Sequence, residues 1–180
     1  QEDVVWIEGP FLDGGVEMTM EYAWSPDSKW LAYTMGGPTF ESNIYASDFE
    51  GTQYNLSLFV DWNYRPRFSP DADYVYFTSS NRWDRGVYRV HLEPKPIEFD
   101  EAAIDSLFID QEDDEKAEED AKTEEPPTVS IDTTRIDLRR EKMVRLDAAS
   151  ECPVVTPDGE KLVFIAPVMG KPEIWTVGID

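Results

Sequence analysis

The chain has 180 residues and a formal net charge of −22 at pH 7, from 16 Lys and Arg against 38 Asp and Glu. Such a negative surface repels phosphate, so nucleic acids and anionic membranes are poor partner classes, and peptides or basic protein surfaces are better ones. The single cysteine, Cys152, excludes an internal disulfide, and no apolar run reaches the length of a membrane span. The start Gln-Glu-Asp has neither a basic region nor an apolar one, so no signal peptide is expected and the chain is interpreted as a mature or excised segment.

A motif of Ser or Thr followed by Pro-Asp occurs three times. The segments read W-S-P-D-S-K-W-L-A-Y-T from Trp24, F-S-P-D-A-D-Y-V-Y-F-T from Phe68 and V-T-P-D-G-E-K-L-V-F-I from Val155. The prolines of the first two lie 44 residues apart, and those of the last two 87 apart, close to two such periods. An Ile-Tyr-type pair follows each proline after 17 or 18 residues, at 44–45, 87–88 and 174–175. Two landmarks in constant phase indicate a structural repeat.

Each repeat predicts the same strands in chain order. Ser/Thr-Pro-Asp is turn chemistry, because proline presets φ and the small polar side chains bond back to the backbone. Short strands are expected before the turns, at 22–24, 66–68 and 153–155, and longer apolar strands after them, at 30–34, 74–78 and 161–165. A third strand carries the Ile-Tyr-type pair. Four strands in about 40–45 residues is the period of a propeller blade. A plain antiparallel meander or sandwich is the alternative, but it does not require this period.

The fold class is therefore predicted as all-β, a β-propeller section of about three four-stranded blades with an acidic loop insert. Residues 1–20 are expected to form a leading strand (4–7) and a loop. One blade is predicted at 21–61, a second at 62–148 with the insert at 93–128, and a partial third at 149–180. Within the insert, residues 110–125 carry ten acidic side chains against two lysines, which predicts a mobile segment. It is either a solvated spacer or a lure for basic partners, and a short helix packed on the propeller is compatible with 99–108.

Three blades do not close a ring, so the chain is predicted to be a fragment of a larger propeller or one part of an oligomeric ring. If residues 4–7 supply the missing outer strand of the last blade, two copies would close a six-bladed ring. Otherwise the exposed strand edges favour association.

The repeat sequences S-P-D-x-K-W-L-A-Y-T and F-T-S-S-N-R resemble the propeller repeats of tricorn-type serine proteases and of the periplasmic Tol-translocation protein. The placement of a charged insert after the third strand of a blade points to the tricorn type. So does the segment after it, which in that family runs approximately I-D-F-D-G-I-x-x-R and then a short strand. Matching positions are Ile131, Asp132, Ile136 and Arg139, with the strand at 143–146, whereas residues 133–135 depart from the pattern.

This resemblance implies a role rather than a reaction. Propellers of tricorn-type proteases are non-catalytic and guide peptides toward a serine-protease domain that lies later in the chain. The leading prediction is such a segment, for substrate access or assembly, with a parent protein that could be a protease. An interaction propeller of Tol type and the propeller of a prolyl-oligopeptidase-type enzyme are the alternatives. The family resemblance alone favours a periplasmic or exported location.

Direct signs of chemistry are few. His91, the only histidine, lies at the end of a predicted strand without a nucleophile motif nearby, and is interpreted as a surface residue at a strand end rather than a triad member. Cys152 is interpreted as a partly buried structural thiol rather than a metal ligand or nucleophile. The aspartates of the turns are explained by turn chemistry, and the glycines lack a phosphate-binding context. No catalytic residue, metal or cofactor is predicted.

One loop is a candidate binding element. Asn81, Arg82, Trp83 and Arg85 join the second and third strands of the middle blade, and Trp with Arg is typical of interface hot spots. The alternative is that the arginines pair with nearby carboxylates and Trp83 packs on a neighbouring blade. The other repeat-position tryptophans, Trp24, Trp30 and Trp175, are predicted to lie in blade cores.

Overall fold

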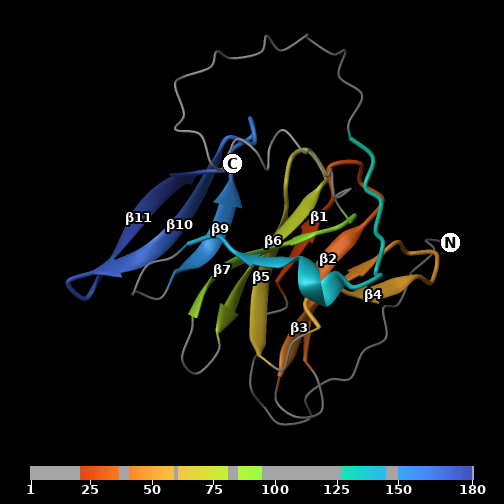
Figure 1. Cartoon of the computed structure of the whole chain (residues 1–180), viewed down its shortest axis with the longest axis horizontal. Coiled ribbons are helices and arrows are strands. Elements are labelled where there is room, and N and C mark those ends of the chain that lie inside the picture. Colours follow the sequence, from red (N-terminus) through yellow and green to blue (C-terminus); the bar gives the residue numbers. More distant parts are fainter. Residues whose placement is uncertain are drawn as a thin grey trace, which may run out of the picture. The chain divides into compact units, whose positions relative to one another are not determined.

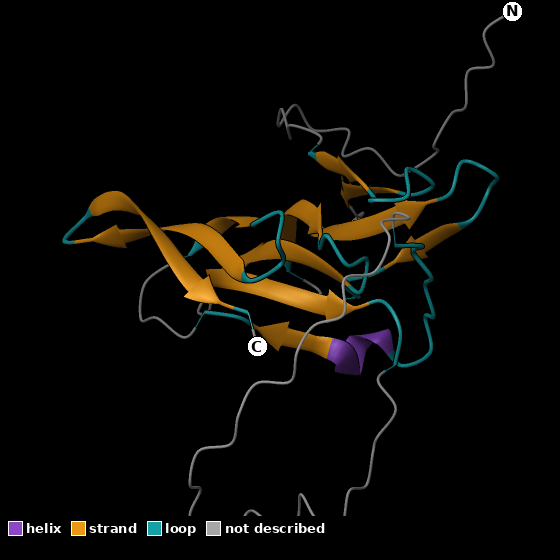
Figure 2. Cartoon of the chain, turned by 90° about the horizontal axis from the view of Figure 1, so that it is seen from above, coloured by secondary structure: helices purple, strands orange, loops and turns teal. Residues whose placement is uncertain are grey.

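A computed structural model describes residues 21–36, 41–58, 61–80, 85–94, 127–144 and 150–179. All of them belong to one compact unit, formed by residues 1–94 and 126–180. This part of the chain is built of strands and loops, with one short 3-10 helix beside β8 (Figures 1 and 2). The predicted strand at residues 4–7 and most of the acidic insert lie outside the described residues. The predicted all-β class is confirmed.

The strands pair as three consecutive groups (Figure 1). The first group is β1 (Tyr22–Trp24), β2 (Leu31–Gly36), β3 (Ser42–Ser47) and β4 (Gln53–Asn55). The second is β5 (Trp62–Phe68), β6 (Tyr74–Ser80), β7 (Arg85–His91) and β8 (Arg140–Lys142), and the third is β9 (Glu151–Val155), β10 (Lys161–Val168) and β11 (Lys171–Gly178). Within each group neighbouring strands run antiparallel. One parallel pair, Ser42 with Trp62, joins the first group to the second. The division into blades at the predicted residue boundaries stays a prediction.

The three turns of the repeat share one hydrogen-bond pattern. In the first, the Ser25 hydroxyl donates to Asp27 Oδ1 (2.6 Å) and accepts from the backbone N–H of Trp30 (2.9 Å). The N–H of Lys29 donates to the same Asp27 oxygen. The matching hydroxyls are those of Ser69, which accepts from Tyr74 N–H at 2.9 Å, and of Thr156, which accepts from Lys161 N–H at 3.0 Å. The turn chemistry read from the repeat therefore explains how each first strand reverses into the second.

The residue after the aspartate of each turn adopts the left-handed backbone region. It is Ser28 (φ 59°) in the first turn and Gly159 (φ 78°) in the third. A Cβ added at Gly159 would meet no atom within 4 Å, so only backbone strain would oppose it. We expect Gly159→Ala to lower the free energy of unfolding by about 1 kcal/mol, and exposed Ser28→Gly to raise it by up to about 1 kcal/mol. Chemical denaturation of both variants tests this. A stability gain in Gly159→Ala or a stability loss in Ser28→Gly would contradict the shared geometry.

Asp27 also anchors the segment that follows the insert. Its Oδ2 accepts a hydrogen bond from the N–H of Val129 at 2.9 Å, across 102 residues of chain. Burial raises the pKa of Asp27, but the hydrogen bonds from Ser25, Val129 and Lys29 outweigh burial and hold this pKa below its usual value of 3.8. The charged carboxylate therefore stabilises the fold above its unfolded-state pKa, and this contribution is lost as the pH falls through the lower folded-state pKa.

Asp27→Asn removes this titration. Between about pH 5 and about pH 2 we expect the wild-type chain to lose more free energy of unfolding than the variant loses. Urea titrations of both proteins at several pH values measure the difference. Equal pH dependence in the two proteins would contradict the assigned hydrogen bonds.

Two hydrophobic clusters lie on opposite faces of β6, whose first six residues are all buried. Val75 and Phe77 belong to the cluster shared with the first group, where Ile44 and Ala46 of β3 pack. Tyr74 and Tyr76 belong to the cluster shared with the third group, where the partners are Leu162, Phe164 and Ala166 of β10. The second group is thus covered on both faces, as radially stacked sheets require.

The strand after the insert lies earlier than predicted. β8 spans Arg140–Lys142, whereas the sequence pattern favoured residues 143–146. Glu141 Oε2 lies 2.8 Å from Arg89 Nε of β7, and the Arg140 guanidinium lies 4.6 Å from the Tyr88 ring centroid. These contacts pair β8 with β7 through charged residues, which the apolar pattern did not indicate. Met143 and Val144 follow β8, and residues 145–146 of the predicted strand lie outside the described residues. Val144, beyond the strand, is buried in the second cluster.

Two of the tryptophans predicted to lie in blade cores are exposed. Trp24 is 54% exposed although it stacks on Phe49, and Trp175 of β11 is 39% exposed. Trp30 is half-buried against the first cluster, as expected. Trp24 and Trp175 occupy the first and third groups, each of which has a described group on one side only, so the prediction was wrong for both.

Candidate functional site: the inner-strand polar cluster

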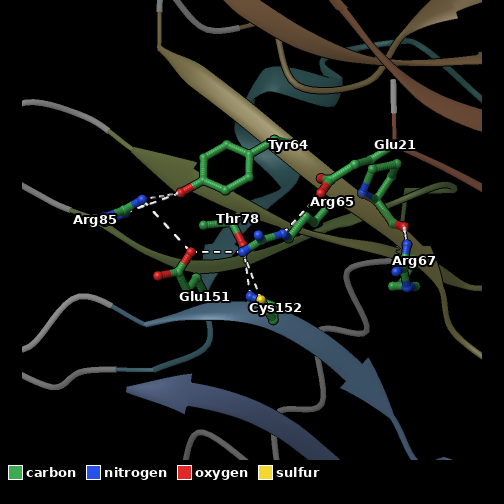
Figure 3. Close-up of polar contacts among 9 residues, drawn as sticks. Glu21, Tyr64, Arg65, Arg67, Thr78, Arg85, Glu151 and Cys152 are labelled. Carbon is green, nitrogen blue, oxygen red and sulfur yellow. Dashed lines mark hydrogen bonds and ion pairs between the residues drawn. The ribbon is translucent and has the colours of Figure 1, made fainter. Parts of the chain in front are cut away.

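The first strands of the three groups bring equivalent residues of the repeat together. Glu21, Arg65 and Cys152 each lie five residues before the proline of their own turn. Arg65 Nε donates to Glu21 Oε1 at 3.0 Å, and Arg65 Nη1 lies 2.7 Å from Cys152 Sγ (Figure 3). In radially stacked sheets, equivalent residues approach one another only near the axis of the stack. These contacts therefore identify β1, β5 and β9 as the inner strands.

Arg65 lies at the centre of this cluster (Figure 3). Its Nη1 also donates to Glu151 Oε2 at 2.8 Å, so one guanidinium joins carboxylates of the first and third groups. Burial opposes its charge, but the hydrogen bonds to Glu21 and Glu151 and the nearby charges raise the pKa of Arg65. We call Glu21, Tyr64, Arg65, Arg85, Glu151 and Cys152 the inner-strand polar cluster.

Local backbone geometry directs the side chains of this cluster toward the neighbouring groups. Arg65 and Cys152 both have positive φ, 60° and 58°, which is costly for residues other than glycine. The register of β5 against β6 shifts between Tyr64 and Arg67, and that of β9 against β10 shifts as well. The first strands of the second and third groups thus each carry a β-bulge at the same repeat position. Bulges re-aim a side chain out of the alternating pattern, here toward the neighbouring groups.

Arg85 is the one residue of the predicted binding loop that the structure describes; Asn81, Arg82 and Trp83 lie outside the described residues. Arg85 Nε and Nη2 donate to Tyr64 Oη at 3.1 and 2.8 Å, and Nη2 lies 3.8 Å from Glu151 Oε2. The hydrogen bonds to Tyr64 and the charge of Glu151 outweigh burial and raise the pKa of Arg85. Arg85 therefore belongs to the cluster, and the binding role of residues 81–83 stays a prediction.

Cys152 is half-buried, and its backbone N–H donates to the Thr78 hydroxyl at 3.2 Å. Burial raises the pKa of its thiol, and the attraction of Arg65 offsets this only in part. The thiolate is the nucleophilic form, so this setting keeps the group in its less reactive state near neutral pH. The geometry agrees with the structural thiol expected from the sequence.

His91 lies elsewhere and is not the surface residue that the sequence indicated. It is 7% exposed, its ring centroid lies 4.0 Å from that of Tyr74, and its Nε2 lies 3.8 Å from Glu141 Oε1. The strand end was placed correctly, but the paired β8 and the rings of β6 cover it. His91 contacts Tyr74 and Glu141, whereas Cys152 contacts Arg65 and Thr78.

In the described ranges no three His, Cys, Asp or Glu side chains gather as metal ligands. None of the helical segments described is long and apolar enough to cross a bilayer. Two guanidiniums and two carboxylates of the inner-strand polar cluster, with side chains 27% to 43% exposed, offer both donors and acceptors to a polar ligand.

No protein-family model matches the sequence. A tricorn protease homolog from Saccharolobus solfataricus is 24% identical over 68 residues, which are 38% of this chain and 6% of that protein. A tricorn-like protease C-terminal subunit from Sulfurisphaera tokodaii is 30% identical over 61 residues, 34% of this chain and 7% of that protein. The chain resembles tricorn-type proteases. The matches span a small part of these relatives' own length.

A solved TolB structure from Agrobacterium tumefaciens matches the fold. It is 17% identical, covers 90% of this chain with a TM-score of 0.58, and is itself covered to 46%. At this identity the likeness concerns the fold alone, which is that of a β-propeller. Both resemblances stated from the repeat motifs, tricorn-type and Tol-type, are confirmed.

The sequence analysis missed Glu21, Arg65 and Glu151. A signal was present, because aligning the three repeats places Glu21, Arg65 and Cys152 in one column of otherwise strand-like segments. Their meeting depends on inner-strand bulges, which the repeat pattern does not encode. Only the arrangement of the three groups reveals the cluster.

Proposed function

We propose that the chain is the non-catalytic β-propeller section of a tricorn-like protease, and that it guides peptides along its inner strands. The observation that carries this proposal is the inner-strand polar cluster. Partly exposed charges of both signs from three groups meet there, on the strands that line the axis of a propeller. A surface of this kind binds a polar peptide weakly and without a sequence preference, which suits peptides that pass along it rather than remain bound.

The chemistry of the candidate nucleophile supports a non-catalytic role. The Cys152 thiol accepts a hydrogen bond from Arg65 and has a raised pKa, while His91 packs against Tyr74 and Glu141. Neither arrangement is the activated nucleophile with an adjacent base that acyl transfer requires. In this proposal any peptide hydrolysis belongs to another part of the parent protein.

A second candidate is an interaction propeller of Tol type, which binds a folded protein instead of passing peptides. The match to the TolB structure over 90% of this chain favours it. The two candidates differ in the ligand: an unstructured peptide binds in the first, whereas only a folded partner binds in the second.

Peptide binding to the isolated chain separates these functions. Two fluorescently labelled, unstructured peptides of equal length are compared, one basic and one acidic, by anisotropy. We expect the basic peptide to bind more tightly and to weaken as salt rises, because the chain carries a charge of −22. Mass spectrometry after incubation should recover both peptides intact. Cleavage would contradict the non-catalytic role, and an absence of binding would favour the Tol-type candidate.

A matched pair of variants locates the binding. Glu151→Gln removes one charge from the cluster, whereas Glu173→Gln removes one from exposed β11. We expect the first to weaken binding of the basic peptide about tenfold and the second by less than about twofold. Equal effects of the two substitutions would mean that the overall negative charge attracts the peptide and that the cluster is not its binding site.

A further inference from the structure

One end of the second group carries a row of three residues on the face that is turned toward the third group. Trp62 of β5 is paired with Ser80 of β6, and Ser80 is paired with Arg85 of β7. Directly opposite residues share a face of an antiparallel sheet, and this face also carries Tyr76, which packs in the cluster shared with the third group. A small residue thus lies between two large ones, Trp62, which is 53% exposed, and Arg85, whose side chain is 43% exposed.

The next row on this face is covered by the third group. It contains Thr78 and Val87, which are paired and both 0% exposed. The Thr78 hydroxyl accepts a hydrogen bond from the N–H of Cys152 in β9 at 3.2 Å. The N–H of Val87 donates to the hydroxyl of Ser150, directly before β9, at 3.2 Å. The third group therefore covers the sheet up to this row and leaves the row of Trp62 accessible.

The same end of the first group is closed, as the repeat shows. Ser42 corresponds to Arg85, because each begins the third strand of its group opposite the last residue of the second strand. Ser42 is 1% exposed, since its hydroxyl donates to the Asn63 carbonyl at 3.0 Å and its own carbonyl accepts from Asn63 Nδ2 at 3.0 Å. Among the described strands, no backbone pairing joins the second group to the third in this way. The row of Arg85 is therefore accessible at a position that the first group buries.

This row continues the inner-strand polar cluster (Figure 3). Tyr64 follows Trp62 by two residues on β5, and its Oη accepts hydrogen bonds from Nε and Nη2 of Arg85. Within the described part of the chain, Arg85 Nη1 makes no hydrogen bond. Glu151 contacts Arg65 and Arg85 through Oε2, so its Oε1 remains as an acceptor. An exposed indole, a guanidinium donor and a carboxylate oxygen are thus available to one ligand.

We propose that Trp62, Ser80 and Arg85 form a subsite for a large apolar side chain of a basic peptide. This inference rests on the peptide-guiding function proposed above, and it adds that the peptide combines positive charge with an aromatic or long aliphatic residue. The apolar side chain displaces water from the indole ring, and the small Ser80 leaves space beside that ring. Arg85 Nη1 donates to a backbone carbonyl of the peptide, and Glu151 attracts a neighbouring basic residue. Tryptophan and arginine are the side chains most typical of binding hot spots.

Two basic, unstructured peptides that differ at one position test the subsite. One carries a single phenylalanine and the other carries serine at that position, with equal length and charge. By fluorescence anisotropy we expect the phenylalanine peptide to bind about tenfold more tightly. Equal affinities would overturn the subsite and leave the peptide-guiding function standing, because both peptides keep their basic residues. Binding of neither peptide would overturn both.

Trp62→Ala locates the contact, and Trp24→Ala is its matched control. Trp24 also lies on an inner strand, β1, and is 54% exposed against 53% for Trp62. Trp62→Ala should weaken binding of the phenylalanine peptide about tenfold and change binding of the serine peptide by less than about twofold. Trp24→Ala should change binding of either peptide by less than about twofold. Equal losses in the two variants, with folding checked by circular dichroism, would overturn the assignment to this row.

Fluorine NMR of the chain labelled with fluorotryptophan follows the contact while the tryptophans stay in place. Trp62→Phe and Trp24→Phe each remove one resonance and so assign it. We expect the phenylalanine peptide to shift the Trp62 resonance and to leave the Trp24 resonance unchanged. A Trp62 resonance that does not move while the peptide is bound, or one that the serine peptide shifts equally, would overturn the proposal.

Discussion

Phe77→Ala should lower the free energy of unfolding by about 3–5 kcal/mol. Phe77 is 0% exposed in β6, stacks on Tyr88 with ring centroids 6.2 Å apart, and fills the cluster between the first two groups. Truncation removes a buried ring and leaves a cavity that two hydrogen-bonded sheets cannot close. Urea denaturation followed by tryptophan fluorescence measures the change.

Leu138→Ala is the control for this substitution. Leu138 is also a large apolar residue but is 73% exposed. We expect a change within about 0.5 kcal/mol, because no packed contact is lost. Similar losses in both variants would mean that the first two groups are not packed around Phe77.

Arg65→Met should cost about 2 kcal/mol of unfolding free energy. The substitution keeps an unbranched apolar stem but removes hydrogen bonds to Glu21 and Glu151 and the contact with Cys152. Charged hydrogen bonds are strong, yet the Arg65 side chain is 32% exposed, so solvent screening reduces the effect. The loss should shrink as salt concentration rises.

Arg135→Met provides a close comparison. Arg135 is exposed and has a φ of 53°, near the 60° of Arg65, so both substitutions act on the same backbone conformation. We expect Arg135→Met to change stability by less than about 0.5 kcal/mol. An equal loss at both positions would assign the effect to the backbone and leave no part for the cluster.

The Ser/Thr-Pro-Asp turns and the strands around them could be predicted because their causes are local. A hydroxyl, a proline and an aspartate within four residues determine the turn, and an apolar run determines the strand that follows. The 44-residue spacing of the repeat then predicted that successive small sheets stack on one another. These features need no knowledge of distant residues.

The failures have non-local causes. Charged contacts with Arg89 and Tyr88 pair β8 with β7, and these partners lie about 50 residues earlier in the chain. His91 is covered by elements that a single strand does not reveal. Trp24 and Trp175 occupy the same kind of repeat position as core residues, but the first and third groups are covered on one side only.

Part of the candidate site could be identified from the sequence. Arg85 was singled out for its charge in an acidic chain, and Cys152 as the one thiol. Arg65 and the two glutamates were missed because polar residues in a strand pattern are ordinary. Their significance arises from positive φ at Arg65 and Cys152, which turns the side chains toward neighbouring groups.

A double-mutant cycle between Arg65 and Glu151 tests most directly the claim that the inner strands of successive groups meet at a polar axis. Arg65→Met, Glu151→Gln and the double variant are compared by their free energies of unfolding. The 2.8 Å contact between these side chains predicts a coupling energy of about 1 kcal/mol or more, reduced by salt. Additivity within about 0.3 kcal/mol would contradict the account, because residues of separate groups that do not touch lose stability independently.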